Sequence, residues 1–379
     1  MQPRPGNSVS TRRGFLKKGV AAGVATVGAG LLTHRASASA EDEKSGRLTP
    51  GDAALLRFAA AAEIIETDFW VQYNELGGVP NTNEVPGGSG NPAYTNAISQ
   101  LDTDMAQYIH DNTDDEFTHQ NFLNAYLESK GASPVSLEPF RTLQGSQATG
   151  SSGKLRITNL MQLTVDTSWW TRYRNGDHNP DLEASFAFPQ AIPTLATGKH
   201  TAIPRTDADT SDATVLQAIA NTAGFHFATI EQGGTTLYPA MAQRATHHEV
   251  LRILLSIGPT ETMHFQTWQD KAGNAPDASF FDPINKSNVV FDVQSAARFK
   301  TEDFKPNLIM PEPCPFISPN LPRCSVIRPT ETKDIAKGVV KFLTDMGLFI
   351  GQSPAFFALL TQLAEEADAA RRGGQGRNM

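Results

Sequence analysis

The chain has 379 residues, 39% hydrophobic and 19% charged, so it can bury a large core in one domain with long insertions or in two domains. Its formal net charge is −8 at pH 7, which argues against nucleic acid as a partner. The 24 prolines and 30 glycines predict long irregular connections between regular elements.

The first 40 residues have the features of a twin-arginine export signal. Arg12 and Arg13 stand in the stretch STRRGFLKK, a weakly apolar Gly- and Ala-rich run follows at about 19–32, and ASA at 38–40 is an A-x-A cleavage site. The apolar run is shorter than the ~20 residues that a membrane span needs. We therefore expect the twin-arginine translocase to export a folded protein to the periplasm or the medium, with no stable membrane span after cleavage.

Removal of this signal also changes the charge of the chain. Residues 1–40 hold six basic residues and no acidic ones, so a mature chain that begins at Glu41 has a net charge of −14 instead of −8. This charge is compatible with cation binding, but a solvated acidic surface is the default explanation. Because the twin-arginine route carries proteins that have already folded, often around a cofactor, the signal favours a metalloprotein.

Two segments before residue 132 have helical composition. The first, at about 50–76, is rich in Ala and Leu, with Thr49 as its N-cap and Pro50 at its first helical position. The stretch GGVPNTNEVPGGSGNP is then a loop. The second helix is predicted at about 94–130, and Gly131 suits its C-terminal end.

A long irregular stretch, at about 132–210, separates these helices from two more. Its aromatic cluster SWWTRYR, at 168–174, predicts that it packs onto the helices. The third helix is predicted at about 211–244. The fourth begins with Thr246 as the N-cap of a capping box, and Pro259 in its interior predicts a kink.

The chain is loop-rich again after the fourth helix, until two further helices predicted at about 331–346 and 354–371. Ser353 suits the N-cap position of the last one. The two cysteines, Cys314 and Cys324, lie in the proline-rich stretch CPFISPNLPRC, and in an oxidising compartment we expect them to form a disulfide.

Two Glu-x-x-His pairs stand on the second and fourth predicted helices. Glu116 and His119 lie in EFTHQNFL, and Glu261 and His264 lie in ETMHFQTW. Residues three apart on a helix share a face, so each pair can direct two ligands toward one point. A single pair is a weak signal, but two copies on separate helices indicate a metal site.

The first and third predicted helices each carry a glutamate in mostly apolar surroundings. Glu63 lies in AAAEIIETDFW and Glu231 lies in ATIEQGGTTLY, where a lone carboxylate would be costly to bury. Each has an aromatic residue seven positions later, Trp70 or Tyr238, which returns to the same helix face. Glu66 is a rival ligand one turn after Glu63, but the matching spacing to the aromatic residues favours Glu63.

This pattern resembles the ligand set of the ferritin-like di-iron and di-manganese carboxylate proteins, in which two helices give one Glu each and two others give Glu-x-x-His. The order along the chain is the same. The stretches LRFAAAAEIIETDFW and FATIEQGGTTLYPAMA also resemble the bacterial ferritin-like domain family, of which some members are exported by the twin-arginine route and some are labelled desiccation-related. The resemblance covers about 50–272, without the insertion at 132–210.

The resemblance implies an all-α fold with three parts after the signal is set apart. A ferritin-like four-helix bundle would occupy 41–275, interrupted by the crossover insertion at 132–210, and a loop-rich extension with two helices would occupy 276–379. The resemblance also implies a di-metal site, whose expected ligands are Glu63, Glu116, His119, Glu231, Glu261 and His264.

By the family pattern, Glu116 and Glu261 bridge two metal ions, each of which also takes one terminal Glu and one His. Four carboxylates balance the charge of two divalent cations. Because the set has no thiolate, it suits iron or manganese. One departure is Trp70, which stands where the family often has Tyr.

The function implied by this resemblance has two main alternatives. The protein is an oxidoreductase that acts on oxygen, peroxide or ferrous iron, or it is a non-enzymatic stress or desiccation protein that sequesters metal. Storage in a hollow shell is the weakest alternative, because the insertion and the C-terminal extension would obstruct the packing of a cage. The sequence leaves catalytic residues open.

The other histidines are weaker candidates for the metal site. We expect His226, five residues before Glu231, to be a packing residue or a residue that supports a ligand, and not a ligand itself. We expect His247 and His248 to be solvated in the first turn of the fourth helix, and His110 to be exposed.

Overall fold

The computed structural model describes residues 46–172, 185–301, 310–312, 320, 322, 324–326 and 333–374. The expected export signal and Cys314 lie outside the described residues, so the signal and the disulfide stay predictions. The part of the chain from Gly46 to Met379 groups as one compact unit.

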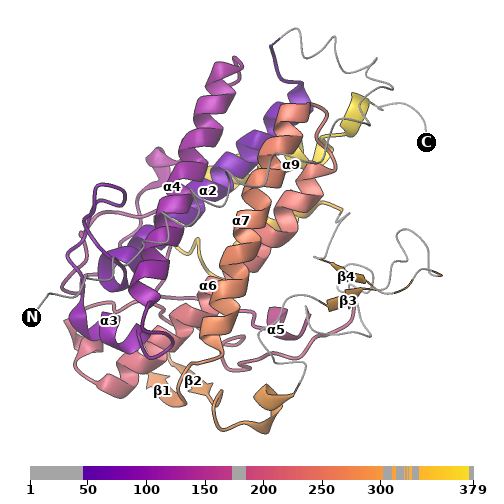
Figure 1. The fold of residues 1–379 in the computed structure, drawn as a ribbon. Coiled ribbons are helices and arrows are strands. Elements are labelled where there is room, and N and C mark those ends of the chain that lie inside the picture. The colour runs from indigo at the N-terminus through magenta and orange to yellow at the C-terminus, as the bar shows by residue number, and fades with distance from the viewer. Residues whose placement is uncertain are drawn as a thin grey trace, which may run out of the picture. The chain divides into compact units, whose positions relative to one another are not determined.

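Four long helices form the body of this unit, as the all-α prediction requires. They are α2 (Pro50–Gly77), α4 (Met105–Ser129), α6 (Ala213–Ala242) and α7 (His248–Ala272). The helix α2 packs most closely on α4, and α6 packs most closely on α7. Figure 1 shows these helices alongside one another, with the crossover connection between α4 and α6. The all-α fold class is confirmed, and none of the described helices is long and apolar enough to cross a membrane.

The helix α2 is buried along most of its length, for reasons visible in its sequence. The Thr49 hydroxyl accepts a hydrogen bond from the backbone N–H of Asp52 at 3.0 Å, and Pro50 begins the helix, as predicted. The small and aliphatic side chains that follow allow neighbours on several sides. Helices α3 (Pro92–Ile98), α4 and α9 (Pro354–Ala369) all contact it.

The predicted continuous helix at 94–130 is wrong, because the chain breaks between α3 and α4. Asp102 Oδ1 accepts a hydrogen bond from the backbone N–H of Asp104 at 2.8 Å, which is a local alternative to the helical pattern. Leu101 is buried against α6, where a Cβ added to Gly224 would lie 2.3 Å from its side chain. The turn therefore seats Leu101 in the core and lets α4 start in a new direction.

The predicted N-cap of the fourth long helix is also wrong by one residue. His247 is the N-cap of α7, and its Nδ1 accepts from the backbone N–H of Glu249 at 3.3 Å. The backbone N–H of Thr246 donates instead to Asp52 Oδ1 at 2.8 Å, at the start of α2. A contact between helices thus replaces the expected local capping box. The helix α7 runs through Pro259 to its end at Ala272.

The crossover from α4 to α6 is irregular, as predicted, and it packs onto the helices. Its regular pieces are short: η2 (Glu138–Phe140), α5 (Trp169–Arg172) and η3 (Asp207–Thr210). The buried Asp68 carboxylate on α2 accepts hydrogen bonds from the backbone N–H groups of Ile157 and Thr158, at 2.9 and 2.8 Å. These bonds tie the insertion to the bundle.

The C-terminal part adds two short antiparallel β-hairpins and two helices. The sequence did not predict the hairpins, which pair β1 (Ala278–Asp282) with β2 (Ser287–Phe291) and β3 (Met310–Glu312) with β4 (Cys324–Val326). The short η4 (Ala297–Lys300) lies between them, and α8 (Ile335–Asp345), α9 and η6 (Arg372–Gly374) follow. Ser353 caps α9, as predicted. Because α9 packs on α2, the extension covers the bundle.

Candidate metal centre

The six residues singled out from the sequence converge inside the bundle. Two groups of potential ligand atoms form, and within each group one such atom per residue lies within 4.8 Å of the others. The first group is Glu63, Glu116, His119 and Glu261. The second group is Glu116, Glu231, Glu261 and His264. The two groups share Glu116 and Glu261, which are the residues expected to bridge.

Helix geometry explains why these side chains meet. Each Glu-x-x-His pair spans three residues on α4 or α7, so its two side chains leave the same helix face. The matching faces of α2 and α6 bring Glu63 and Glu231 to the same layer. All four carboxylates are fully buried, whereas the two imidazole side chains are each 12% exposed.

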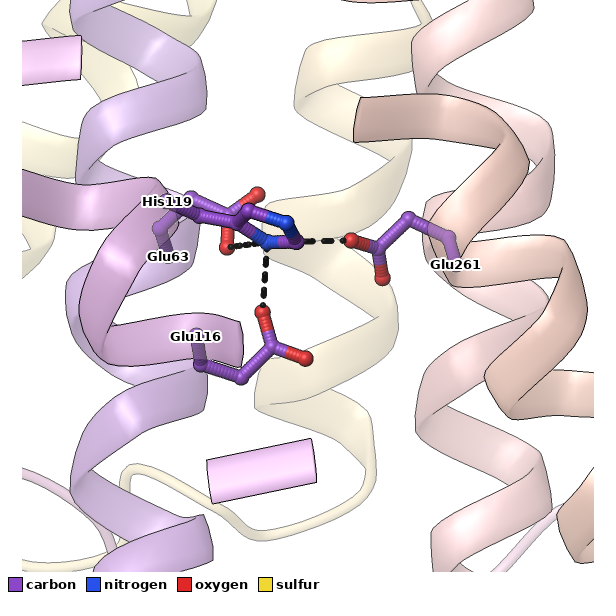
Figure 2. Close-up of side chains that lie close together, drawn as sticks. All are labelled: Glu63, Glu116, His119 and Glu261. Carbon is purple, nitrogen blue, oxygen red and sulfur yellow. Dashed lines mark hydrogen bonds and ion pairs between the residues drawn. The ribbon is translucent and has the colours of Figure 1, made fainter. Parts of the chain in front are cut away.

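The first half of the centre gathers around His119. Its Nδ1 lies 3.0 Å from Glu116 Oε2, 3.3 Å from Glu63 Oε2 and 3.5 Å from Glu261 Oε1. Figure 2 shows these three carboxylates pointing toward the imidazole ring. The atoms come from α2, α4 and α7, so the group links three helices.

The second half gathers around His264 and has an additional contact. His264 Nδ1 lies 3.3 Å from both Glu116 Oε1 and Glu231 Oε2. Its other ring nitrogen, Nε2, lies 3.1 Å from Asp115 Oδ2. A carboxylate at Nε2 orients an imidazole that binds metal through Nδ1. Asp115 is the residue just before Glu116, and the sequence analysis did not single it out.

Hydrogen bonds from neighbouring side chains hold the terminal carboxylates. Trp70 Nε1 donates to Glu231 Oε1 at 3.0 Å, and the Tyr238 hydroxyl donates to Glu63 Oε1. The aromatic residues noted at seven-residue spacing therefore do face the site. Each one contacts the carboxylate of the opposite helix, not that of its own.

Asn112 also contacts two of the carboxylates, and sequence reasoning missed it. Its Nδ2 donates to Glu116 Oε1 at 2.7 Å and to Glu231 Oε1 at 3.1 Å. Trp268 Nε1 donates to Asn112 Oδ1 at 2.7 Å, which sets the orientation of the amide. In the sequence, this contact was indicated by the position of Asn112 one turn before Glu116, on the same face of α4.

Glu66 stays outside both groups of ligand atoms and is half-buried. Burial, followed by the charges of Glu116 and Glu63, raises its pKa well above the usual range. Of the two carboxylates considered for α2, the geometry thus brings Glu63 to the centre and leaves Glu66 beside it.

In the absence of a metal cation, the environment of the centre favours the protonated forms of several of its carboxyl and imidazole groups. Burial, and after it the charge of Glu63, raises the pKa of Glu116 to about 7, and burial followed by the charge of Glu116 raises the pKa of Glu261 well above its usual range. Burial would lower the pKa of His119, but Glu63 and Glu116 outweigh it and raise this pKa to about 11. Burial would raise the pKa of Glu63, but the charge of His119 acts against burial, and this pKa is lowered overall.

The donor set passes a test of whether a metal fits. Both carboxylate oxygens of Glu261 are buried, and neither has a hydrogen-bond partner among the described residues. Its contact at 3.5 Å with His119 Nδ1 is an ion pair only. An unsatisfied buried carboxylate is costly, and a cation at this place would remove that cost. Oxygen and imidazole donors without sulfur suit iron or manganese.

Gly234 gives Glu261 the room that it needs. A Cβ at Gly234 would lie 2.6 Å from Glu261 Oε2 and 2.8 Å from its Cγ, closer than atoms can pack. A Cβ at the preceding Gly233 would meet nothing within 4 Å. The pair of glycines inside a predicted helix was the signal for this close approach, and the sequence analysis did not use it.

Within the described part of the chain, the other histidines belong to neither group of ligand atoms. His226 is fully buried and bonded to Tyr73, in agreement with its expected packing role. His248 is exposed, as expected, but His247 is buried as the cap of α7. The expected exposure of His110 is wrong, because it is 5% exposed and its Nε2 lies 3.0 Å from the hydroxyl of Thr82 in the loop after α2.

Comparison with known families agrees with this architecture. A model of the ferritin-like domain matches residues 51–274. The chain belongs to the ferritin-like family. The match spans the four long helices and both Glu-x-x-His pairs of this ferritin-like protein. No curated protein and no solved structure matches the chain.

Proposed function

We propose that this ferritin-like protein is an exported oxidoreductase with a di-metal centre of iron or manganese, acting on oxygen, peroxide or ferrous iron. The sharing of Glu116 and Glu261 between the two groups of ligand atoms carries the proposal. Two ions held by common carboxylates lie close enough to act on one small molecule. The other ligands would divide between the ions: Glu63 and His119 with one, Glu231 and His264 with the other.

The bound metals would supply the one-electron chemistry that Glu and His side chains lack. The protein's part is to hold the ligands and to exclude bulk water. Trp70 and Tyr238 fix the two terminal carboxylates, and Asn112 links a terminal carboxylate to a shared one. These buried hydrogen bonds hold the carboxylates of Glu63, Glu116 and Glu231 in place before metal arrives.

A pocket beside His119 supports a reaction with a small molecule. It has a volume of 580 Å³, lies between α4 and α7, and is lined by Phe122, Ile253 and Ile257 among others. A purely structural metal site has no need for such an approach to one of its ligands.

Metal analysis of the purified full chain, followed by assays of peroxide consumption and ferrous oxidation, tests the proposal. We expect about two ions per chain and one of the two reactions. Metal binding and the reaction should both be lost in Glu116→Gln. Both should be kept in Glu365→Gln, which changes an exposed glutamate on α9. Bound metal without either reaction would favour the second candidate, a non-enzymatic protein that sequesters metal under stress or desiccation. A chain that binds no metal would refute both.

Export by the twin-arginine route is a separate part of the proposal, supported by the motif around Arg12 and Arg13. We expect the exported protein to begin at Glu41, which N-terminal sequencing can check. Changing both arginines to lysine should leave the protein in the cytoplasm. If export continues unchanged, the protein uses another route.

A further inference from the structure

Tyr73 on α2 and His226 on α6 form a buried hydrogen-bonded pair near the metal centre. Both side chains are 0% exposed, and the Tyr73 hydroxyl lies 2.8 Å from His226 Nδ1. Neither residue belongs to the groups of ligand atoms. A phenol and an imidazole held together in a dry core are costly to bury unless each satisfies the other.

The partners of His226 determine which atom donates. His226 Nε2 lies 3.2 Å from the sulfur of Met346, and a thioether sulfur can only accept a hydrogen bond. Nε2 therefore carries the proton and Nδ1 is bare, so the Tyr73 hydroxyl donates to Nδ1. Burial lowers the pKa of His226 to about 3, which agrees with a neutral ring. The phenolic proton of Tyr73 thus points at a free base.

Aromatic contacts connect this pair with the metal centre. The Tyr73 ring lies 5.8 Å from the Trp70 ring, between centroids. Trp70 in turn stacks on Trp268 at 5.3 Å and donates through Nε1 to Glu231 Oε1 at 3.0 Å. Tyrosine and tryptophan are the aromatic side chains that lose a single electron most readily. The contacts form a continuous route from Tyr73 through Trp70 to a proposed metal ligand.

We propose that Tyr73 and His226 are a proton-coupled redox site that supplies one electron to the metal centre through Trp70. Tyr73 loses one electron and its hydroxyl proton. The electron would pass through Trp70 to a metal ion held by the Glu and His ligands, which oxygen or peroxide would have oxidised beforehand, and would lower the oxidation state of that ion by one. The proton moves from Tyr73 Oη to His226 Nδ1, so charge and atoms balance. The inference rests on the proposed oxidoreductase function.

The surroundings suit both states of the pair. After the transfer, the imidazolium has two N–H donors, and the phenoxyl oxygen and the sulfur of Met346 remain as their acceptors. Because burial disfavours the imidazolium, the proton returns to the oxygen when Tyr73 regains an electron. The pair can therefore hold one oxidising equivalent and give it up without a rearrangement of the core.

Two other buried tyrosines provide a contrast. The Tyr94 hydroxyl donates to the backbone carbonyl of Ala202 at 2.8 Å, and an amide oxygen is a very weak base that does not take up the proton. The Tyr238 hydroxyl donates to Glu63, a proposed ligand, and so its oxidation would occur at the centre itself. Tyr94 is the matched control, and Tyr238 is the rival location for a radical.

Electron paramagnetic resonance of the full chain tests the inference. The protein is loaded with iron, its metal content is measured, and it is mixed with hydrogen peroxide and frozen. We expect an organic radical signal in the unaltered chain and in Tyr94→Phe, a loss of the signal in Tyr73→Phe, and a slower rise in Trp70→Phe. A fluorinated tyrosine placed at position 73 alone keeps the hydroxyl, and it should add a fluorine splitting to the signal even if Tyr73→Phe does not fold.

Three results would overturn the inference. The signal could persist in Tyr73→Phe and vanish in Tyr238→Phe, or the loaded chain could consume peroxide without any radical. Nuclear magnetic resonance of metal-free protein with ¹⁵N-labelled histidine could also show His226 protonated at Nδ1. A chain that binds no metal at all would instead defeat the proposed function, and the pair would then lack its oxidant.

Discussion

Trp70 and Tyr238 each donate a hydrogen bond to the carboxylate that lies seven residues before the other. Trp70 Nε1 binds Glu231 at 3.0 Å, and the Tyr238 hydroxyl binds Glu63. The two bonds cross between α2 and α6, so each helix positions the terminal carboxylate of its partner. The exchange reflects the similar halves of the bundle, α2 with α4 and α6 with α7. The two hydrogen bonds are not equivalent, because the indole N–H of Trp70 can only donate whereas the phenol of Tyr238 can also give up its proton.

The two histidines of the centre should be needed for full metal loading. His119→Ala and His264→Ala each remove one imidazole donor, so each should lower the metal content to about one ion per chain or less. His248→Ala is the control, because His248 is an exposed residue at the start of α7. Elemental analysis of the three variants provides the measurement. Equal metal content in all three would mean that the two groups of ligand atoms do not bind metal.

Neighbouring glycines on α6 should respond to alanine in opposite ways. Gly234→Ala places a Cβ 2.6 Å from Glu261 Oε2, so it should displace this carboxylate and reduce metal binding. Gly233→Ala meets nothing within 4 Å and should keep metal binding while stabilising the helix by up to ~1 kcal/mol. Thermal unfolding and metal titration distinguish the two. Equal metal affinity in both variants would show that Glu261 has no part in the site.

The contact between Asp115 and His264 should make the two metal positions unequal. Asp115→Asn removes the charge that orients His264 from its outer nitrogen at 3.1 Å. Because the Asp115 side chain is 47% exposed, we expect a modest loss in affinity, about tenfold, for the ion bound by His264. A two-step metal titration measures this. If both steps weakened together, Asp115 would act on the whole bundle and not on His264.

Metal affinity should rise with pH. In the metal-free protein the pKa of Glu116 is raised to about 7, the pKa of Glu261 is raised well above its usual range, and the pKa of His119 is raised to about 11, so these groups hold protons. A metal ion must displace these protons, so binding releases protons and weakens as the pH falls below about 7. Calorimetric titration in buffers of different ionisation enthalpy measures the release. Constant affinity between about pH 6 and 8 would contradict the buried carboxylate cluster.

The sequence predicted the proposed metal ligands better than it predicted the residues that hold them in place. The Glu-x-x-His spacing predicted both pairs, because residues three apart share a helix face whatever the rest of the fold does. Asn112 was missed although it lies one turn before Glu116, because an asparagine on α4 shows its role only when α6 brings Glu231 within 3.1 Å of it.

The sequence by itself determined the features that depend on neighbours along the chain. Thr49 and Ser353 cap their helices as predicted, and the apolar surroundings of Glu63 and Glu231 predicted their burial. Where no distant contact intervenes, local hydrogen bonds and helical periodicity are encoded in short stretches, so they can be inferred without a fold.

Only the tertiary structure decided the features that depend on a contact between distant segments. The break before α4 exists because Leu101 packs against Gly224, and the cap of α7 moves to His247 because Asp52 binds the backbone of Thr246. Such contacts depend on how one helix is positioned along another. That position results from the packing of the whole core, which no short stretch of sequence encodes.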